Sequence, residues 1–366
     1  MPTSERPDAA PARGLLAHAA YACRHSGVCC SSDWDIPVDD ALHARLTRAI
    51  AAGELRPRDG VGLRDRPDLP SGTRTVLGLL RGRCVFHREG PCGCGLHAWG
   101  GADAKPAACR QFPWIAVHDP RGTFVSLSHV CPSAADRLTD PSLLVVAPLP
   151  RPGASFEGLD IRRALPPAID ARRLLDWDAL TAWETQALDA CARAETPEGV
   201  LADLSALRAH ARTWTRRDGA LADWIARWTP APHAADVVTW QPDPALDAIA
   251  RAAVPPGLAV PPPIAAVAPA WRGSAPLLRR YLAARLLACW PLHYGRGLAT
   301  ALAYVAALLT IVAGELARRG VSAAPTDADV LAAIGETDRL VVHLAAPDAL
   351  ARGLDGWAAG HLEGGL

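Results

Sequence analysis

The chain has 366 residues, and its 38 basic and 38 acidic side chains give a formal net charge of zero. This balance argues against a broad basic face for nucleic acid, and a composition that is 50% hydrophobic can build a sizeable core in about two domains. Lys105 is the only lysine, and asparagine is absent. We attribute both to the codon bias of a GC-rich genome, so the many arginines are not taken as a phosphate-binding set.

The first third of the sequence is irregular and rich in cysteine, glycine and proline. Residues 1–20 are expected to be a loose lead-in; they carry charges and make a poor signal peptide, so the cytoplasm is the expected location. Residues 21–146 are expected to form a cysteine-cluster domain. Within it, apolar spacing predicts a helix near 39–52, and short apolar runs predict strands at 114–118 and 123–128.

The second half has a different pattern. Residues 147–169 are Pro-rich and are expected to be a linker. From 170 to 366 apolar residues recur at the helical period, which predicts an α-helical domain with an irregular Pro-rich segment at 254–270. Three residues have the chemistry and position of helix N-caps: Asp170, Thr196 and Thr326. The expected fold is mainly α: an irregular cysteine-rich metal- or cluster-binding N-terminal domain with little β, followed by an α-helical domain.

The segment Leu298–Gly314 is the best candidate for a membrane span. It has 17 residues, which is the lower end of the spanning range, and its many alanines make it only weakly hydrophobic. We therefore expect a central buried helix here and no membrane span.

Eight of the ten cysteines are gathered in the first domain. They are Cys23, Cys29, Cys30, Cys84, Cys92, Cys94, Cys109 and Cys131. Disulfides, buried small apolar side chains and metal ligands are the three explanations that compete. Disulfides need an oxidising compartment, for which no export signal is seen. Burial as a small apolar side chain suits the other two cysteines, Cys191 and Cys289, which lie among alanines and leucines at helical spacing.

The close spacing of some thiols favours metal binding. Cys29 and Cys30 are adjacent, and Cys92 and Cys94 flank a single glycine in a Pro/Gly loop. Glycines allow tight turns that aim several sulfurs at one point, and thiolates suit zinc, Cu(I) or iron–sulfur clusters. We therefore take all eight cysteines as candidate metal ligands.

Four histidines lie among these cysteines: His25, His87, His97 and His129. Each is either a substitute for a thiolate, a support for a ligand, or an ordinary surface or core histidine. Arg110, next to Cys109, either offsets thiolate charge, holds a carboxylate or packs within its loop.

The order of the cysteine motifs resembles a known family. Cys23-Arg-His-Ser-Gly-Val-Cys29-Cys30 resembles the opening of bacterial cysteine-cluster proteins of the CxxCxxCC type, which are described as zinc- or iron-chelating, although Ser26 stands where relatives often carry cysteine. Elements similar to those of flagellin lysine N-methylases follow across residues 21 to 135. They are the Trp34 segment, Cys84-Val-Phe-His, Cys92-Gly-Cys94-Gly-Leu-His97, Lys105-Pro-Ala-Ala-Cys109-Arg-Gln-Phe-Pro and Ser126-Leu-Ser-His-Val-Cys131-Pro.

The resemblance implies a cofactor and an activity. The cofactor is a [4Fe-4S] cluster, or alternatively zinc, held by cysteines of this domain, and His97 in its matched motif is the histidine we expect at the metal. One four-ligand site would use half of the eight cysteines, and two sites are also conceivable. The activity is methyl transfer from S-adenosylmethionine to lysines of a protein substrate, flagellin or another lysine-bearing protein. No strand–Gly-rich turn–helix unit is seen, so catalytic and donor-binding residues are not assigned.

Two other functions fit the same cysteines. One is a non-catalytic zinc- or iron-binding or electron-carrying protein without methyl transfer. The other is an interaction module stabilised by zinc, whose metal would be colourless.

Overall fold

The computed structural model divides into two compact units. We call them the large unit, Met1–Tyr21, Ile115–His129 and Ala134–Leu366, and the cysteine unit, Ala22–Trp114 and Val130–Ser133. The structure describes residues 11–31, 34–67, 72, 74–89, 93–142, 144–152, 156–170, 172–230, 240–258, 260–266, 273–321 and 324–362. The domain boundary expected near residue 146 thus differs from the structural division, because residues 115–129 belong to the large unit.

The predicted fold class is wrong. About 52% of the chain is helix and 14% is strand in several sheets, so the protein is mixed α/β rather than mainly α with a cysteine-rich domain of little β. Most strands of the cysteine unit are only two or three residues long. Strands this short cannot show the alternating pattern by which a strand is recognised in a sequence.

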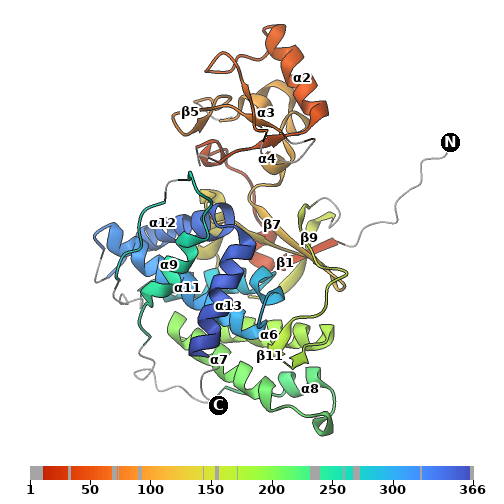
Figure 1. Ribbon diagram of the computed structural model, residues 1–366, viewed down its shortest axis with the longest axis vertical. Helices are drawn as coiled ribbons and strands as arrows, with labels where there is room; N and C mark the ends of the chain where they lie inside the picture. The colour runs from red at the N-terminus through yellow and green to blue at the C-terminus, as the bar shows by residue number, and fades with distance from the viewer. Residues whose placement is uncertain are drawn as a thin grey trace, which may run out of the picture. The chain divides into compact units, whose positions relative to one another are not determined.

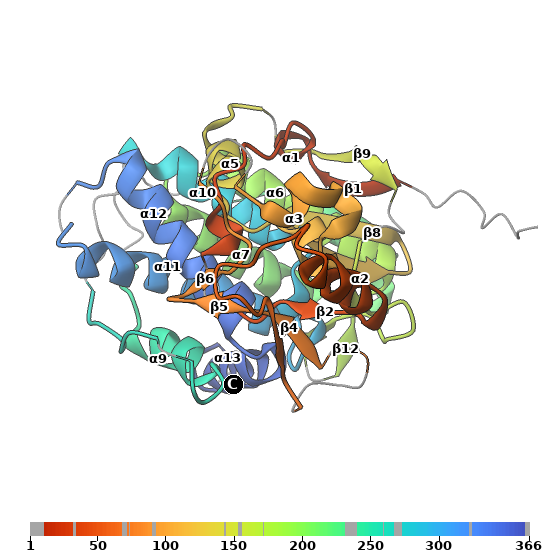
Figure 2. The same ribbon diagram turned by 90° about the horizontal axis from the view of Figure 1, so that it is seen from above.

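A five-stranded sheet of order β10-β7-β8-β1-β9 lies in the large unit. Its strands are β1 (Pro11–Leu15), β7 (Trp114–Asp119), β8 (Gly122–Leu127), β9 (Val146–Pro152) and β10 (Gly158–Asp160). The strands predicted at 114–118 and 123–128 are confirmed as β7 and β8. β1 runs parallel to β8 and antiparallel to β9, and Figures 1 and 2 show β1 beside β9.

Three of these strands lie where no regular structure was expected. β1 falls in the expected lead-in, and β9 and β10 fall in the expected linker. β9 has a proline at every second position, 148, 150 and 152, and this pattern in the sequence predicted a linker. It is an edge strand of the sheet, and an edge strand tolerates proline because one side of it needs no N–H donors.

Helices make up most of the remaining large unit. They are α1 (Leu16–Ala19), the second half of α5 (Pro132–Ala135), α6 (Trp177–Arg193), α7 (Pro197–Thr213), α8 (Leu221–Ala226), α9 (Pro244–Ala252), α10 (Ala275–Leu286), α11 (Leu298–Arg318), α12 (Asp327–Asp338) and α13 (Pro347–His361). α11 packs against α7, α9, α12 and α13 (Figure 1). Among the described residues, α11 alone is long and apolar enough to cross a membrane, and its apolar window is wholly buried inside the protein, as expected for a core helix.

The predicted helix caps are partly confirmed. Thr196 accepts a hydrogen bond from Gly199 N–H at the start of α7, and Thr326 forms a capping box with Asp329 at the start of α12. The predicted cap at Asp170 is wrong. Asp170 ends β11 (Ala168–Asp170), which pairs with β12 (Arg173–Leu174), and α6 begins later with Asp176 as its cap.

A buried ion-pair network holds the described part of the Pro-rich segment 254–270, which has no helix or strand. Arg251 bonds to Asp247 Oδ1 and to Glu315 Oε1, each at 2.8 Å, and donates to the Pro261 carbonyl at 2.8 Å. The guanidinium therefore ties this segment to α9 and α11 without regular structure.

The cysteine unit is built from short elements around one long helix. The elements are η1 (Val28–Cys30), β2 (Pro37–Val38), α2 (Asp40–Ala51), β3 (Leu63–Asp65), β4 (Thr75–Leu77), β5 (Leu79–Leu80), β6 (Arg83–Cys84), α3 (Gly95–Gly100), η2 (Ala102–Ala104) and α4 (Ala107–Gln111). The helix predicted near 39–52 is confirmed as α2, with the Asp39 carboxylate accepting from Leu42 N–H. Leu42 and Leu46 of α2 are buried in the unit's own apolar core.

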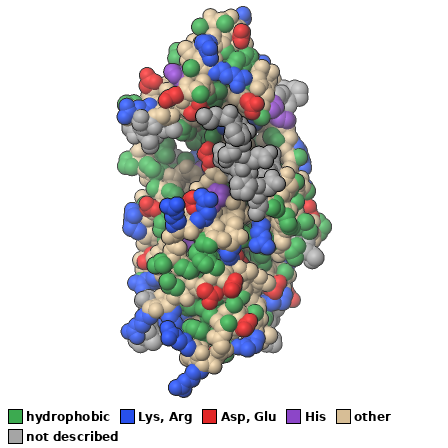
Figure 3. Space-filling view, turned by 90° about the vertical axis from the view of Figure 1, so that its right-hand side faces the viewer, with side chains coloured by type: hydrophobic (Ala, Val, Ile, Leu, Met, Phe, Trp, Pro, Cys, Tyr) green, Lys and Arg blue, Asp and Glu red, His purple; other side chains and the backbone are tan. Residues whose placement is uncertain are grey.

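The charges at the surface are mixed. On the face that Figure 3 displays, positive and negative side chains are interspersed among apolar ones. This pattern agrees with the net charge of zero.

Candidate metal centre

Three cysteines of the cysteine unit have thiols within hydrogen-bonding reach of a fourth, Cys30. The Cys30 thiol shares hydrogen bonds with the sulfurs of Cys29, Cys84 and Cys94. We call these four residues the thiol cluster. None of them is in a disulfide. Cys84 belongs to the apolar core of the unit, and Cys30 and Cys94 pack against it, so the cluster borders a dry interior.

Three separate turns bring these thiols together. The Cys29–Cys30 pair lies in η1, which the chain enters through Gly27 at a φ of +74°. A Cβ on Gly27 would lie 2.8 Å from His87 Nε2, so both the backbone angle and the close approach require glycine. Cys84 ends the β5–β6 hairpin, and Cys94 stands at the N-cap position of α3, where it forms a β-bridge with His87.

The hydrogen bonds shift the pKa of Cys30 and those of the other three thiols in opposite directions. Hydrogen bonds with Cys29, then with Cys84 and Cys94, raise the pKa of Cys30 far above its usual range. The same bond to Cys30 lowers the pKa of Cys29, Cys84 and Cys94, that of Cys94 to about 6. Cys29, Cys84 and Cys94 are therefore the thiols most prone to lose their protons, and thiolates are the form that binds metals.

The only lysine of the chain acts on this cluster. After the hydrogen bond from Cys30 and the main-chain N–H groups of His97 and Leu96, the Lys105 ammonium further lowers the pKa of Cys94. The same ammonium adds to the lowering of the Cys29 pKa, which the Cys30 hydrogen bond leads. Arg110 does not take this role; its guanidinium donates to the Lys105 carbonyl at 2.6 Å, and so it packs within the loop.

Cys109 lies beside the thiol cluster as a fifth thiol. Burial raises its pKa above the usual range, and the neighbouring Cys29, Cys84 and Cys94 raise it further. Cys109 is therefore a protonated neighbour of the cluster.

The other cysteines lie in different settings. Cys23 is exposed, and its sulfur is 4.0 Å from His25 Nδ1. Cys131 is buried in the same unit, and Cys92 lies outside the described residues. Cys191 and Cys289 are buried in the core of the large unit, as expected for small apolar side chains. Burial raises the pKa of Cys191 above its usual range and that of Cys289 to about 12.

Two of the candidate histidines carry buried ring nitrogens next to the cluster. His97 Nδ1 and His87 Nδ1 have no hydrogen-bond partner among the described residues. The His97 ring lies 5.7 Å from that of His25, centroid to centroid. An unsatisfied ring nitrogen beside a set of thiols is suited to ligate or to support a metal.

The cluster fits a metal by its chemistry but is not arranged around an ion. Within the described ranges, no three His, Cys, Asp or Glu side chains already surround a metal position. The sulfurs of Cys29, Cys84 and Cys94 instead lie within hydrogen-bonding reach of the Cys30 thiol, which keeps its proton. Metal binding releases thiol protons, so loss of that proton would free all four sulfurs as ligands.

His129, the fourth candidate histidine, is not with the cysteines. It lies in the large unit, where its Nδ1 and main-chain N–H bond to Asp338 Oδ2 at 2.9 and 2.7 Å. Asp338 is 0% exposed and ends α12, just before a π-helical turn at Arg339–Leu344. Although burial opposes it, the charge of Arg285 and the hydrogen bonds of His129 hold the pKa of Asp338 below its usual range.

This buried polar cluster around Asp338 was missed in the sequence. Tyr281 OH donates to Asp338 Oδ1 at 2.9 Å, Arg285 Nη1 lies 3.8 Å from the same oxygen, and Arg285 also donates to Ser126 Oγ at 3.0 Å. Burial lowers the pKa of His129, and its Nε2 has no partner among the described side chains. The available signal was the position of Arg285, which lies four residues after Tyr281 on the apolar face of α10.

Two half-buried histidines of the large unit make its stability depend on pH. Burial lowers the pKa of His293 and of His343 from 6.5 to about 4. Because these folded-state values lie below the unfolded one, the stabilisation is present above pH 6.5 and is lost as the pH falls toward 4. We expect the free energy of unfolding to drop by about 3 kcal/mol for each histidine over this range.

Urea unfolding at several pH values between 7.5 and 4.5 measures this loss. His293→Gln should remove its share of the pH dependence, whereas His361→Gln, at an exposed position, should leave it unchanged. A free energy of unfolding that is constant over the whole range would contradict the prediction.

Comparisons with known proteins add no relative. No family model matches the chain, and no curated protein and no solved structure matches it.

Proposed function

We propose that the cysteine unit binds a soft metal through the thiol cluster. The observation that supports this is the convergence of Cys29, Cys84 and Cys94 on the Cys30 sulfur, from three separate segments and without a disulfide. Four thiols match the ligand number of a [4Fe-4S] cluster and of a structural zinc site. We favour the iron–sulfur cluster, on the resemblance of the cysteine motifs, and keep zinc as the alternative.

The surrounding residues would tune such a centre. Four thiolates carry four negative charges, which Lys105 beside them would partly offset. The main-chain N–H groups of Leu96 and His97 point at Cys94, and that of Phe86 points at Cys84. When bound, an iron–sulfur cluster supplies electron transfer, and N–H groups directed at its sulfurs raise its potential.

We further propose that the chain is a protein lysine N-methylase that uses S-adenosylmethionine. The support is the order of the motif elements across residues 21 to 135, as in flagellin lysine N-methylases. In the reaction, the bond from the sulfonium sulfur to the methyl group breaks, the neutral lysine nitrogen bonds to that methyl, and the amine proton leaves to a base or water. Catalytic and donor-binding residues stay unassigned.

Donor binding separates this enzyme from a non-catalytic metal protein. We expect calorimetry with S-adenosylmethionine and the anaerobically purified protein to show binding at one site per chain. Radiolabelled donor should then label lysines of flagellin or of another candidate protein. A metal-loaded protein that binds no donor would overturn the methylase proposal and leave the metal- or electron-carrying function.

A further inference from the structure

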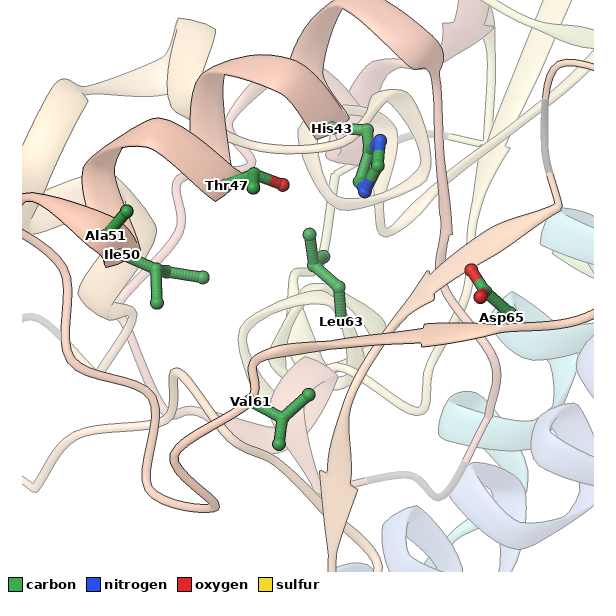
Figure 4. A pocket seen from close by; sticks show the side chains of 7 residues that line it. All are labelled: His43, Thr47, Ile50, Ala51, Val61, Leu63 and Asp65. Carbon is green, nitrogen blue, oxygen red and sulfur yellow. The ribbon is translucent and has the colours of Figure 1, made fainter.

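A groove of about 380 Å³ lies between α2 and β3 in the cysteine unit. Figure 4 shows side chains of α2 along one side and those of β3 and its preceding loop along the other, with Leu63 pointing toward the helix. The volume is that of a site for a small molecule or for a few side chains of a peptide. The residues that line the groove are His43, Thr47, Ile50, Ala51, Val61, Leu63 and Asp65.

β3 offers unused main-chain groups at this groove. The sheet has the order β2-β4-β3, so β3 is an edge strand. Gly62 accepts a hydrogen bond from Gly78 N–H, and Arg66 donates to the Arg74 carbonyl. In an antiparallel pair, successive residues point their main-chain groups to opposite sides. The main-chain groups of Leu63 and Asp65 therefore point away from β4, toward the open edge.

The side chains of the groove give it a chemical preference. Val61 is 65% exposed, and with Leu63 and Ile50 it makes an apolar floor that is open to solvent. Asp65 lies two residues after Leu63, and its carboxylate is on the same face of β3. No cation among the described residues pairs with this carboxylate. An apolar position followed two residues later by an acidic one is complementary to an apolar and a basic side chain at the same spacing.

We propose that this groove binds an extended segment of a partner protein, which pairs with β3 as an additional strand. Alternate side chains of such a segment face the same way as Leu63 and Asp65. The segment carries an apolar residue against Leu63 and a lysine or arginine, two positions along, against Asp65. Charge complementarity and the free strand edge select this occupant. The inference depends on neither the metal nor methyl transfer.

Peptide binding tests the proposal directly. The probes are two fluorescein-labelled peptides, Ser-Thr-Val-Thr-Lys-Thr-Ser and Ser-Thr-Val-Thr-Glu-Thr-Ser, titrated with the full chain. We expect saturable binding of the lysine peptide, weaker by up to about fivefold for Asp65→Asn, which is the range of one exposed ion pair. Asp65→Lys should reverse the preference in favour of the glutamate peptide. N-methylation of the peptide amides that face β3 should abolish binding while leaving every side chain in place.

The controls separate the groove from general charge. Asp40→Lys makes the same charge change on α2 at an exposed position outside the groove, and it should keep the preference for the lysine peptide. Equal binding of both peptides, no binding of either, or binding that survives N-methylation would overturn the proposal. A change from dimer to monomer in Asp65→Lys would also overturn it, since a second copy of the chain would then be the occupant.

Discussion

Asp338→Asn is expected to lower the free energy of unfolding of the large unit by about 3–5 kcal/mol. The carboxylate is fully buried and accepts hydrogen bonds from Tyr281 and from two groups of His129. It is also the negative charge nearest to the buried Arg285. An asparagine amide leaves that guanidinium without its countercharge in a dry interior, which costs far more than one hydrogen bond.

Urea unfolding followed by circular dichroism measures this change. Asp189→Asn, the same substitution at an exposed position of α6, should change the unfolding free energy by less than about 0.5 kcal/mol. The double variant Arg285→Met and Asp338→Asn should lose less unfolding free energy than the sum of the losses in the two single variants. The reason is that Arg285→Met removes the uncompensated charge. A loss as small as that of the Asp189 control would mean that the polar cluster does not stabilise the fold.

Cys30→Ala is expected to abolish metal binding by the cysteine unit. Cys30 is the member that connects the other three thiols, so its loss removes one ligand and separates the remaining sulfurs. Ligand loss is coupled to folding in small metal-binding units, so the variant should also lose solubility. Cys191→Ala and Cys289→Ala, which remove thiols buried in the large unit, should bind metal as the native chain does.

Metal per chain after anaerobic purification measures this difference. Cys84→Ala provides a second test, because a thiol-cluster variant that stays soluble should still lack metal. Full metal content in soluble Cys30→Ala, or loss of metal in Cys191→Ala, would show that the ligands lie elsewhere.

The elements with strong local signals could be predicted from the sequence. α2 shows a helical period after a capping aspartate, and α7 and α12 begin with threonine caps whose partners lie three residues away. Such signals involve neighbours in the chain, so no tertiary information is needed. β1 and β9 could not be found this way, because β9 reads as a Pro-rich linker and only the sheet order shows that it is an edge strand.

The candidate site also has one part that the sequence could predict and another that only the fold shows. Motif spacing selected the cysteines as a group, but it could not show that Cys30 lies at the centre or that Cys23 is exposed. His129 lies among the cysteines in sequence, yet its partner Asp338 is 209 residues away. A contact at that separation leaves no local pattern.

The single lysine of the chain, Lys105, lies where it acts on the thiol cluster. Codon bias explains why lysine is rare, but not why the one that remains is at position 105. Its ammonium adds to the lowering of the pKa of Cys29 and Cys94, which the hydrogen bond from Cys30 leads. A positive charge beside thiolates is the physical reason to keep a lysine there.

Metal analysis of the anaerobically purified chain, with its visible spectrum, tests the central claim most directly. Binding through the thiol cluster predicts a brown protein with about four irons per chain and broad visible absorption, as for a [4Fe-4S] cluster. Stoichiometric zinc in a colourless protein would keep the thiol site and replace the cluster. A folded chain that contains neither metal, and that takes up neither on reconstitution, would contradict the claim.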